Sequence, residues 1–350
     1  GPLHAAACMF DWFELGETDV FLTAAPMFHV VGMQAGMTVP IALGGTTVLL
    51  PRWDREVAAK LMRDFGVTAW PTVPTAVIDF MNRPGLAPDD LATLRVVWGG
   101  GIAMPAAVAG KLREMTGLNF LEGWGLSETI APGTANPPHA PKTQCGGVST
   151  FNTDVVIVEP ESLAPLPTGE VGELLISGPQ VMRGYWNNPE ASEDTFGAVI
   201  EDEPPQRYLR TGDMGFLANG ELYINGRIKE LIIINGNNYY PQDIEETCSA
   251  SHPALGPRAA VFGVNSHGGE EIVVILELSK SMQDELTSGH LDEITSNIRS
   301  SVYRKHSLPL KEIIYVRSNG IPQTTSGKIC RVSCRRNYEA RSLAAIGLTA

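Results

Sequence analysis

Short apolar runs alternate with helical patterns along the first part of the chain. From residue 18 onward, the runs "DVFLTAAP", "TTVLLP" and "VTAWPTVP" are separated by stretches such as "EVAAKLMRDFG" and "AAVAGKLREMTG", in which apolar residues recur at the spacing of one helix face. Apolar runs of about four to eight residues bounded by Pro or Gly are typical of buried strands. Their alternation with helices predicts a layered, mostly parallel α/β sheet for residues 1–150.

The pattern changes twice further along the chain. Residues 151–228 contain "TDVVIVEP", "GEVGELLISG" and "GELYINGR", short strand patterns joined by Pro and Gly turns, which predict an antiparallel, β-rich subdomain. The chain then continues with "LIIIN", "AAVFGVN", "EIVVILEL", a helical pattern at 290–304 and "IIYV", an α+β pattern about the size of a small domain. We therefore expect a large N-terminal domain at residues 1–228 and a small, mobile α+β domain at residues 229–350.

Charge separates the same two parts of the chain. The 350 residues carry 26 Lys and Arg against 39 Asp and Glu, a formal net charge of -13. Residues 230–350 hold 13 acidic and 12 basic residues, so almost all of the negative charge lies in the larger part. Nucleic acid and anionic membranes attract clustered Lys and Arg, and this composition predicts neither partner. An anionic substrate must therefore be bound by individual Lys, Arg or backbone N–H groups at its site.

Cysteine spacing and hydropathy bear on metal binding, disulfide formation and membrane insertion. The cysteines include no C-x-x-C pair and no spacing typical of a zinc site or a disulfide framework. Reduced thiols, and with them a cytoplasmic location, are therefore expected. No apolar run approaches the ~20 residues that a membrane span needs. The cysteines are Cys8, Cys145, Cys248, Cys330 and Cys334.

A glycine-rich stretch, "EGWGLSET" at residues 122–129, carries candidate chemistry. Gly123 and Gly125 would let the backbone approach a flat ligand closely, and Trp124 offers a stacking face. Glu128 is a hard oxygen ligand suited to a cation such as Mg²⁺. Taken alone, the stretch is more typical of a tight turn than of a binding site.

Two further stretches have the same ambiguity. "VVWGGGIAM", at residues 96–104, places three glycines after a buried strand, and the carboxyl ends of parallel strands are where α/β folds bind ligands. In "YLRTGDMGFL", at residues 208–217, the carboxylate of Asp213 could accept hydrogen bonds from two sugar hydroxyls. On their own, both stretches are more typical of structural turns.

Near the C-terminus, "NGIPQTTSGKIC" contains a Gly-Lys pair that invites comparison with a phosphate-binding loop. Six residues separate Gly320 from Gly327, and Ile329 follows Lys328. A Walker A loop has four residues between its glycines and Ser or Thr after the lysine. Lys328 is therefore not a Walker lysine.

A helix is predicted after Pro26 in "PMFHVVGMQAGM", residues 26–37. It would place His29, Met33 and Met37 on one face at a spacing of four residues. For the two methionines, a stripe that faces the core is the more ordinary interpretation. A carboxylate substrate needs no deprotonation at neutral pH, so His29 is not expected to act as a general base.

In this order, the stretches resemble the adenylate-forming superfamily, which includes acyl-CoA synthetases, fatty acyl-AMP ligases, nonribosomal adenylation domains and luciferases. The resemblance runs through six ordered motifs: "DVFLTAAPMFHVVG", "GWGLSET", "GEVGELLISGPQVMRGYWNNPE", "YLRTGD", "GRIKELIIINGNNYYPQDIE" and "PQTTSGKICR". It implies an acid–thiol ligase that uses ATP and Mg²⁺. A carboxylic acid would first form acyl-AMP, and a thiol would then take the acyl group after the small domain has rotated.

The resemblance also implies roles for individual residues. Lys328 resembles the mobile lysine that bridges the substrate carboxylate and the α-phosphate, and Lys229 resembles the hinge. Glu128 resembles the magnesium-linked carboxylate, and Ser127 stands where the family commonly has Thr. Asp213 resembles the ribose-binding aspartate. The implied nucleotide site further contains Gly100, Gly101, Ile102, Glu122, Gly123, Trp124 in place of the usual Tyr, Gly125 and Arg227, and the implied acyl pocket contains His29, Val30 and Met33.

One family motif is missing from the chain. A Ser/Thr/Gly-rich loop that ends in Pro-Lys-Gly would lie just before "HAAACMFDWF", close to the first residue of this sequence. We therefore expect a large domain that is incomplete at its N-terminus. A non-catalytic fragment or interaction subunit without the phosphate loop is the alternative from another class.

The acyl acceptor stays open between CoA and the phosphopantetheine of an acyl carrier protein. "MRGYWNNPEAS" and the short link from "LSET" to "CGGVS" resemble acyl-CoA synthetases, whereas "NGNNYYPQDIE" and "HPAL" resemble fatty acyl-AMP ligases, which load carrier proteins. The acid is also open. Basic residues suited to either acceptor are Arg299, Arg304, Lys305, Lys311, Arg317, Arg331, Arg335 and Arg336, with a solvated basic face as the alternative.

Overall fold

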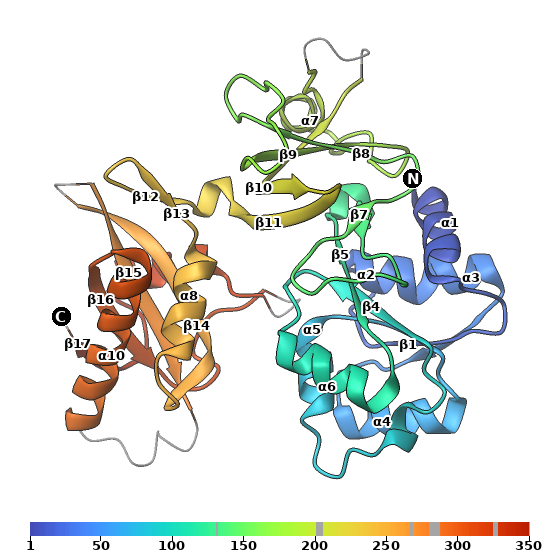
Figure 1. The fold of residues 1–350 in the computed structure, drawn as a ribbon, viewed down its shortest axis with the longest axis horizontal. Helices are drawn as coiled ribbons and strands as arrows, with labels where there is room; N and C mark the ends of the chain where they lie inside the picture. The colour runs from blue at the N-terminus through green and yellow to red at the C-terminus, as the bar shows by residue number, and fades with distance from the viewer. Residues whose placement is uncertain (131, 201–205, 267–268, 280–287, 325–327, 350) are drawn as a thin grey trace. The chain divides into compact units, whose positions relative to one another are not determined.

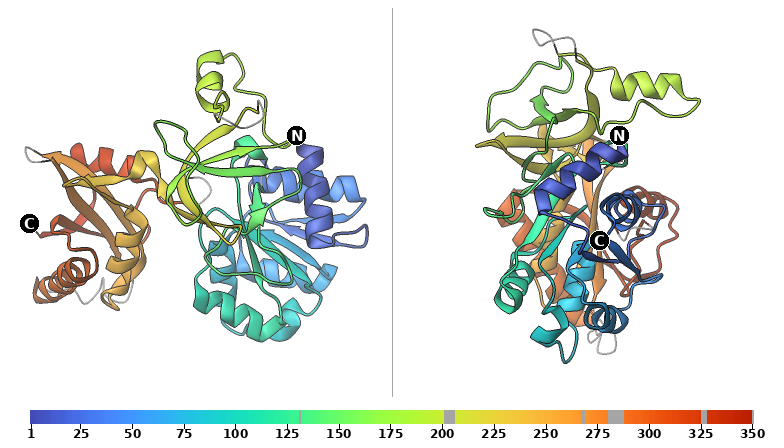
Figure 2. Two further views of the ribbon diagram at one scale, coloured as in Figure 1. Left: turned by 45° about the horizontal axis from the view of Figure 1, so that its top comes forward. Right: turned by 90° about the vertical axis from the view of Figure 1, so that its right-hand side faces the viewer.

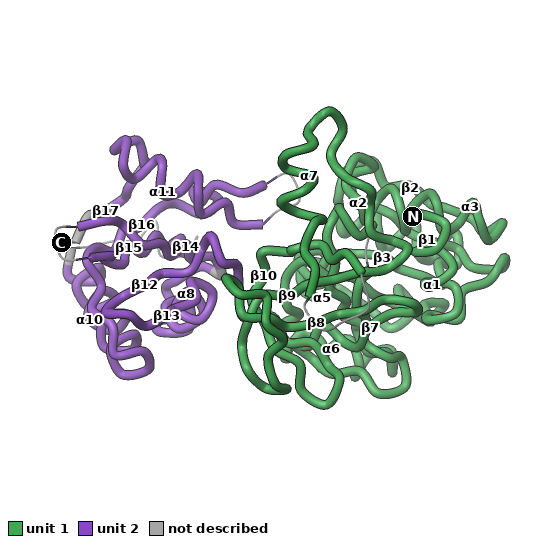
Figure 3. Tube along the Cα trace, turned by 90° about the horizontal axis from the view of Figure 1, so that it is seen from above, with its two compact units in different colours: residues 1–225 green, residues 226–350 purple. Residues whose placement is uncertain are grey.

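The computed structural model describes residues 1–130, 132–200, 206–266, 269–279, 288–324 and 328–349 (Figures 1 and 2). The chain divides into two compact units, residues 1–225 and 226–350 (Figure 3). The division falls within strand β11 (Glu221–Arg227), near the border predicted between residues 228 and 229.

Unit 1 is built around a seven-stranded sheet with the strand order β2-β1-β3-β4-β5-β6-β7. Strands β1 to β5 pair in parallel, and β6 and β7 extend the sheet with antiparallel pairs. The parallel strands and their intervening helices confirm the predicted α/β class. The strands are β1 (Val20–Thr23), β2 (Thr46–Leu49), β3 (Ala69–Thr72), β4 (Val96–Gly100), β5 (Phe120–Trp124), β6 (Thr134–Ala135) and β7 (Val148–Ser149).

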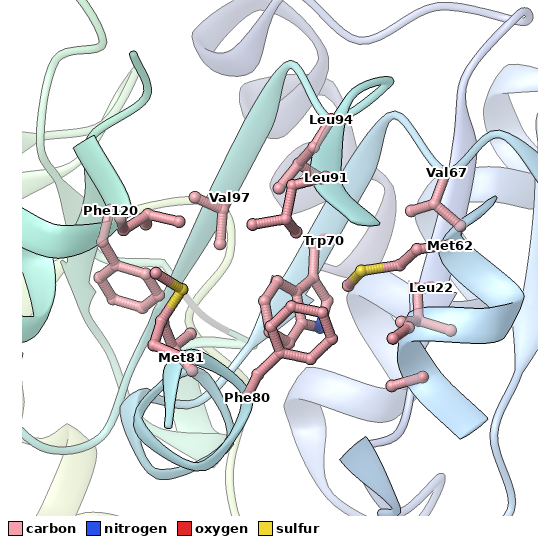
Figure 4. Packing of buried hydrophobic residues seen from close by; sticks show 14 of the residues in the cluster. Leu22, Met62, Val67, Trp70, Phe80, Met81, Leu91, Leu94, Val97 and Phe120 are labelled. Carbon is pink, nitrogen blue, oxygen red and sulfur yellow. The ribbon is translucent and has the colours of Figure 1, made fainter. Parts of the chain in front are cut away.

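Every second residue along each strand packs on a first helical layer. Leu22, Trp70, Val97 and Phe120 share a buried cluster with helices α4, α5 and α6, in which the rings of Trp70 and Phe80 have centroids 5.3 Å apart (Figure 4). Complete burial of a large apolar side chain contributes about 2 kcal/mol. The helical segments of this layer are α4 (Arg55–Phe65), α5 (Pro74–Met81), η2 (Pro88–Leu91) and α6 (Ala106–Thr116).

The neighbouring strand residues face a second layer. Phe21, Ala69 and Leu121 pack with residues of α1, η1 and α3 on the other side of the sheet. Successive strand residues point to opposite faces, so a strand with helices on both faces is apolar along its whole length. This layer consists of α1 (Pro2–Phe13), α2 (Val30–Met33), the π-helical η1 (Gln34–Thr38) and α3 (Val39–Leu43).

The second half of unit 1 is a four-stranded sheet with the order β11-β10-β9-β8. Strands β8, β9 and β10 pair antiparallel, as the short strand patterns predict. The register between β9 and β10 shifts between Arg210 and Met214, so β10 is irregular around Asp213. The elements are β8 (Asp154–Val158), β9 (Gly172–Ser177), α7 (Pro189–Phe196) and β10 (Leu209–Ala218).

Unit 2 has a four-stranded mixed sheet, β14-β15-β16-β17, and a two-stranded ribbon, β12-β13. Ile272 and Val274 face a cluster with α8 and α10, whereas Val273 and Ile275 face a cluster with α11. The elements are η4 (Ile228–Glu230), β12 (Ile232–Ile234), β13 (Asn237–Tyr239), α8 (Pro241–Ala250), β14 (Leu255–Ser266), β15 (Gly269–Leu278), α10 (Ser288–His306), β16 (Leu310–Val316), α11 (Arg331–Glu339) and β17 (Ala345–Thr349). Within the described ranges, no helix has the length and apolar character that crossing a membrane requires.

Candidate functional site

Two of the predicted glycine-rich stretches meet at the carboxyl ends of β4 and β5. These strands are parallel neighbours, and their register pairs Gly100 directly with Gly123. A Cβ at Gly100 would overlap the carbonyl oxygen of Gly123, so the close approach of the two strands requires glycine there. Gly101 follows with a positive φ of 96°, and Ile102 is 43% exposed. The strand order alone places both stretches at one edge of the sheet.

Glu122 holds the loops around this edge. Its carboxylate accepts hydrogen bonds from the backbone N–H of Met104 at 3.2 Å and of Gln144 at 2.8 Å. The side chain is buried, and this burial raises the pKa of the Glu122 carboxyl above its ordinary value against the opposing effect of both hydrogen bonds. The structure therefore gives Glu122 a definite local task, which is to fix the segments after β4 and before β7.

Trp124, at the end of β5, reaches into the β-rich half of unit 1. Its indole N–H donates to Oδ2 of Asp213 at 2.9 Å. Asp213 is 5% exposed, and its backbone N–H donates to the hydroxyl of Thr211 at 3.0 Å, in the irregular part of β10. The predicted adenine-stacking residue and the predicted ribose carboxylate are thus joined across 89 positions of sequence. Sequence reasoning gave both residues but not the bond between them.

Ser127 and Glu128 begin the short 3₁₀ helix η3 (Ser127–Thr129), two residues after Gly125. Oε1 of Glu128 accepts a hydrogen bond from the hydroxyl of Tyr185 at 2.9 Å. Burial, and then the neighbouring Glu128 carboxylate, raise the pKa of the Tyr185 hydroxyl, so it stays protonated and able to donate. Tyr185 was not among the predicted site residues, although it lies in the family-like stretch "MRGYW".

The single carboxylate of Glu128 suits a magnesium ion that takes most of its ligands from a bound nucleotide and from water. Among the residues that the structure describes, no group of three or more His, Cys, Asp or Glu gathers as a metal site. Mg²⁺ in nucleotide enzymes commonly takes one or two protein carboxylates and completes its coordination with phosphate and water oxygens. A single carboxylate, oriented by the Tyr185 hydroxyl, fits that type of binding.

The segment before η1 differs from the predicted helix. His29 is the N-cap of α2, and its Nδ1 accepts from the N–H of Val31 at 3.3 Å, so the helix begins at Val30 and not after Pro26. After Met33 the chain forms the π-helical η1, whose wider turn breaks the spacing of four residues. Met37 is 42% exposed, so the prediction that the two methionines form a core-facing stripe is wrong for Met37.

Close backbone packing gives the physical reason for this break. A Cβ at Gly32 would overlap the carbonyl oxygen of Pro26, and a Cβ at Gly36 would overlap the side chain of Thr23. The backbone therefore follows these neighbours instead of a regular helix. His29, Val30 and Met33, the residues of the predicted acyl pocket, nevertheless stay within one turn of each other around α2.

The remaining predicted residues belong to unit 2. Arg227 ends β11, and Lys229 lies in η4. Lys328 is exposed on a hairpin in which the backbone N–H of Thr324 donates to the carbonyl of Lys328 at 2.7 Å, and Gln323 bridges Ile329. Residues 325–327, the middle of the predicted "TTSGK" tip, lie outside the described residues.

Several of the basic residues considered for the acyl acceptor are engaged inside unit 2. Lys311 pairs with Glu271, Arg335 pairs with Glu339, and Arg299 donates to the carbonyl of Leu310 at 2.5 Å. Arg331 is largely buried between two carboxylates. Its assignment to a surface set for CoA or a carrier protein is therefore wrong.

Comparisons with known proteins place both parts of the chain in AMP-related families. Residues 2–186 match the AMP-binding enzyme family, and residues 229–347 match the AMP domain of the Disco-interacting protein 2-like family. The chain is 33% identical over 330 residues to the long-chain-fatty-acid–CoA ligase of Bacillus subtilis (strain 168), covering 93% of this chain and 55% of that protein. It is 41% identical over 185 residues to the medium-chain-fatty-acid–acyl-carrier-protein ligase JamA of Moorena producens (strain JHB), covering 53% of this chain and 31% of JamA.

The solved structures give the same fold. The ATP-bound RpMatB-BxBclM chimera B1 superposes with a TM-score of 0.85 at 25% sequence identity, over 97% of this chain and 64% of that one. In each of these comparisons the chain spans less than two thirds of the length of the protein it matches.

Proposed function

Because the chain belongs to the family of AMP-binding enzymes, we propose that the protein activates a carboxylic acid of the fatty acyl class as its acyl-AMP and passes the acyl group to a thiol. The observation that carries the proposal is the joined site at the end of β5, where Trp124 donates to the buried Asp213 beside the paired glycines of β4 and β5. A glycine-rich strand edge next to a carboxylate suits a base and a ribose.

The residues of unit 1 would bind and orient the nucleotide. The glycine-rich segments at the ends of β4 and β5 would border a planar base, and the Asp213 carboxylate would accept hydrogen bonds from ribose hydroxyls. Glu128 is the residue that would hold Mg²⁺, which supports the pyrophosphate leaving group when bound with ATP. Arg227, at the end of β11, would contact the nucleotide as a residue of unit 2.

Lys328 would serve the first half-reaction. The oxygen of the substrate carboxylate forms a bond to the α-phosphorus of ATP, and the bond from that phosphorus to pyrophosphate breaks. Two anions approach each other in this step, so a positioned ammonium stabilises the transition state by several kcal/mol. In the second half-reaction a thiol attacks the acyl carbon and AMP leaves, after unit 2 has changed its pose about Lys229.

CoA is the acceptor that we propose first, and the phosphopantetheine of an acyl carrier protein is the second candidate. The two similar ligases differ in this respect, since the name of one specifies CoA and that of the other an acyl carrier protein. The two parts of the chain also match different family models. A cytoplasmic setting is part of the proposal and is supported by five cysteines without a disulfide.

A screen of pyrophosphate release by the intact protein tests the proposal. Carboxylic acids of graded chain length are supplied with Mg·ATP, and acyl-AMP is identified by mass; CoA or carrier protein is added in parallel. We expect release that depends on the acid, with one acceptor consuming the acyl-AMP. An intact protein that binds AMP but releases no pyrophosphate with any acid would favour the non-catalytic alternative.

A further inference from the structure

Arg331 joins three segments of unit 2 that lie far apart in the sequence. Its Nε and one terminal nitrogen donate to the two oxygens of Glu245, each at 2.7 Å, and the other terminal nitrogen donates to Glu230 at 2.5 Å. The Arg331 side chain is 13% exposed, and those of Glu230 and Glu245 are 23% and 11% exposed. A planar guanidinium that binds two carboxylates in this way is fixed in both position and orientation.

Glu245 anchors this arrangement to the core of unit 2. It lies on α8, and its Oε1 also accepts a hydrogen bond from the backbone N–H of Val261 in β14, at 2.9 Å. Neighbouring Ile244 is fully buried in the cluster that α8 forms with the sheet. Arg331 is therefore attached to a rigid part of the fold through its Glu245 contacts.

Lys328 lies three residues before Arg331, on a hairpin that is anchored at both ends. We define the Lys328 hairpin as residues 321–324 and 328–331. The backbone N–H of Cys330 donates to the carbonyl of Pro322 at 2.9 Å, which closes the base of the hairpin. One leg leads directly into Arg331.

The other leg ends on a buried carboxylate. The backbone N–H of Ile321 donates to Glu277 at 3.2 Å, and Glu277, which is 1% exposed, also accepts from Arg258 at 3.3 Å. Arg258 donates in addition to the side chain of Asn319 at 2.9 Å. The hairpin that carries Lys328 is thus attached through an ion pair on each side.

Glu230 connects this hairpin to the predicted hinge. It directly follows Lys229 and is the last residue of η4. We propose that Arg331 is a positioning residue, which fixes the Lys328 hairpin to the segment that carries the hinge. A change of pose about Lys229 then moves Lys328 together with that segment, as one rigid unit. This inference rests on the proposed function, since it concerns how Lys328 is delivered for acyl-AMP formation. A displacement of about 1 Å at a reacting group can cost about a hundredfold in rate.

The variant Glu230→Gln tests the inference with little disturbance of the fold. It removes the charge that links Arg331 to η4 and leaves both contacts between Arg331 and Glu245 in place. In the intact protein we expect acyl-AMP formation to slow by about tenfold or more, because the Lys328 hairpin loses its fixed link to the hinge segment. Thioester formation from supplied acyl-AMP, which does not use Lys328, should change by less than about threefold.

Two further variants complete the test. Arg331→Lys keeps the positive charge but loses the planar fork, and it should impair the same half-reaction at least as strongly as Glu230→Gln. Glu339→Gln is the matched control, because it removes a carboxylate from an exposed ion pair on α11, with Arg335, and should change neither half-reaction.

The outcomes separate the inference from the function on which it rests. Selective loss of acyl-AMP formation in Glu230→Gln, with an unchanged melting temperature, supports the positioning role. An active wild type in which Glu230→Gln behaves like Glu339→Gln, or loses both half-reactions equally, overturns the positioning role alone. A wild type that releases no pyrophosphate with any acid overturns the proposed function and the positioning role together.

Discussion

The two units of the chain hold their candidate groups by different physical means. In unit 1, the groups at the ends of β4 and β5 and in the irregular middle of β10 are held by strand pairing, by close glycine contacts and by the hydrogen bond from the neutral indole of Trp124 to Asp213. In unit 2, Lys328 projects on a hairpin whose two legs end on the buried ion pairs of Glu277 and Arg331. Unit 2 is the nearly neutral part of the chain by sequence, yet it contains these ionic anchors.

The difference follows from where each group is attached. The end of a strand within a sheet has neighbours on both sides, so packing fixes a group there with few side-chain contacts. The Lys328 hairpin packs apolar side chains only at its base, through Ile321 and Ile329. Charge-assisted hydrogen bonds, which are directional and about twice as strong as neutral ones, can fix its orientation. A group that binds a ligand can therefore rely on packing, whereas a group that must be delivered relies on ion pairs.

The largest expected effect is that of Lys328→Ala, which removes the delivered charge. Acyl-AMP formation should fall by about a hundredfold to a thousandfold, as electrostatic stabilisation of the transition state is lost. Thioester formation from supplied acyl-AMP should be preserved. Single-turnover assays of each half-reaction in the intact protein measure both effects, with Lys60→Ala, which removes an exposed lysine paired with Asp64 on α4, as the control. Equal loss of both half-reactions would contradict the role of Lys328.

The next largest effect is expected at the border of the two units. Lys229→Pro fixes φ near −65° at a position in η4, and it should favour one pose and slow one half-reaction by about tenfold more than the other. The ratio of the two single-turnover rates, compared with that of the wild type, is the measurement. Parallel loss of both rates with a lower melting temperature would show instead that Lys229 is an ordinary turn residue.

A smaller effect is expected from Asp213→Ala in unit 1. Loss of the carboxylate should weaken AMP binding by about 1–3 kcal/mol, because ribose hydroxyls would lose a charged acceptor. Calorimetric titration of AMP measures this change, and Asp64→Ala, at an exposed ion pair on α4, provides the control. Unchanged affinity would return Asp213 to the ordinary role of a turn aspartate.

The smallest effect is expected from Trp124→Phe, which keeps an aromatic ring and removes the donor to Asp213. Affinity for AMP should fall by about 1 kcal/mol, the net value of one hydrogen bond. The double variant with Asp213→Ala should then be no weaker than Asp213→Ala alone, since the bond is already gone. Additive losses in the two variants would mean that Trp124 and Asp213 act independently, and the contrast between the two units would lose its basis in unit 1.

The sequence predicts the layers of the fold because strand and helix periodicity are local. Residues such as Leu22 and Trp70 need only their immediate neighbours to be recognised as buried strand positions. The edge at which Gly100 meets Gly123 follows as well, since parallel strands share their carboxyl ends. These features required no knowledge of distant contacts.

Other features depend on contacts that the local pattern does not contain. The break after Met33 follows the close approach of Gly32 and Gly36 to earlier backbone and side-chain atoms. Arg331 reads as a surface residue in "KICRVSCRR" until its partners, 86 and 101 positions away, are known. The hydrogen bond from Tyr185 to Glu128 is hidden in the same way, although the motif around Tyr185 marks it as worth inspecting.

The burial of the thiols makes the hairpin observable by chemistry. Cys8, Cys145, Cys248 and Cys334 are buried, and burial raises the pKa of Cys248 and of Cys334 to about 12. Cys330 is only partly buried, and hydrogen bonds from Ser333 lower the pKa of its thiol. An alkylating dye at neutral pH should therefore label Cys330 first. Because Cys330 lies two residues from Lys328, the attached dye would report by fluorescence on the environment of the hairpin during turnover.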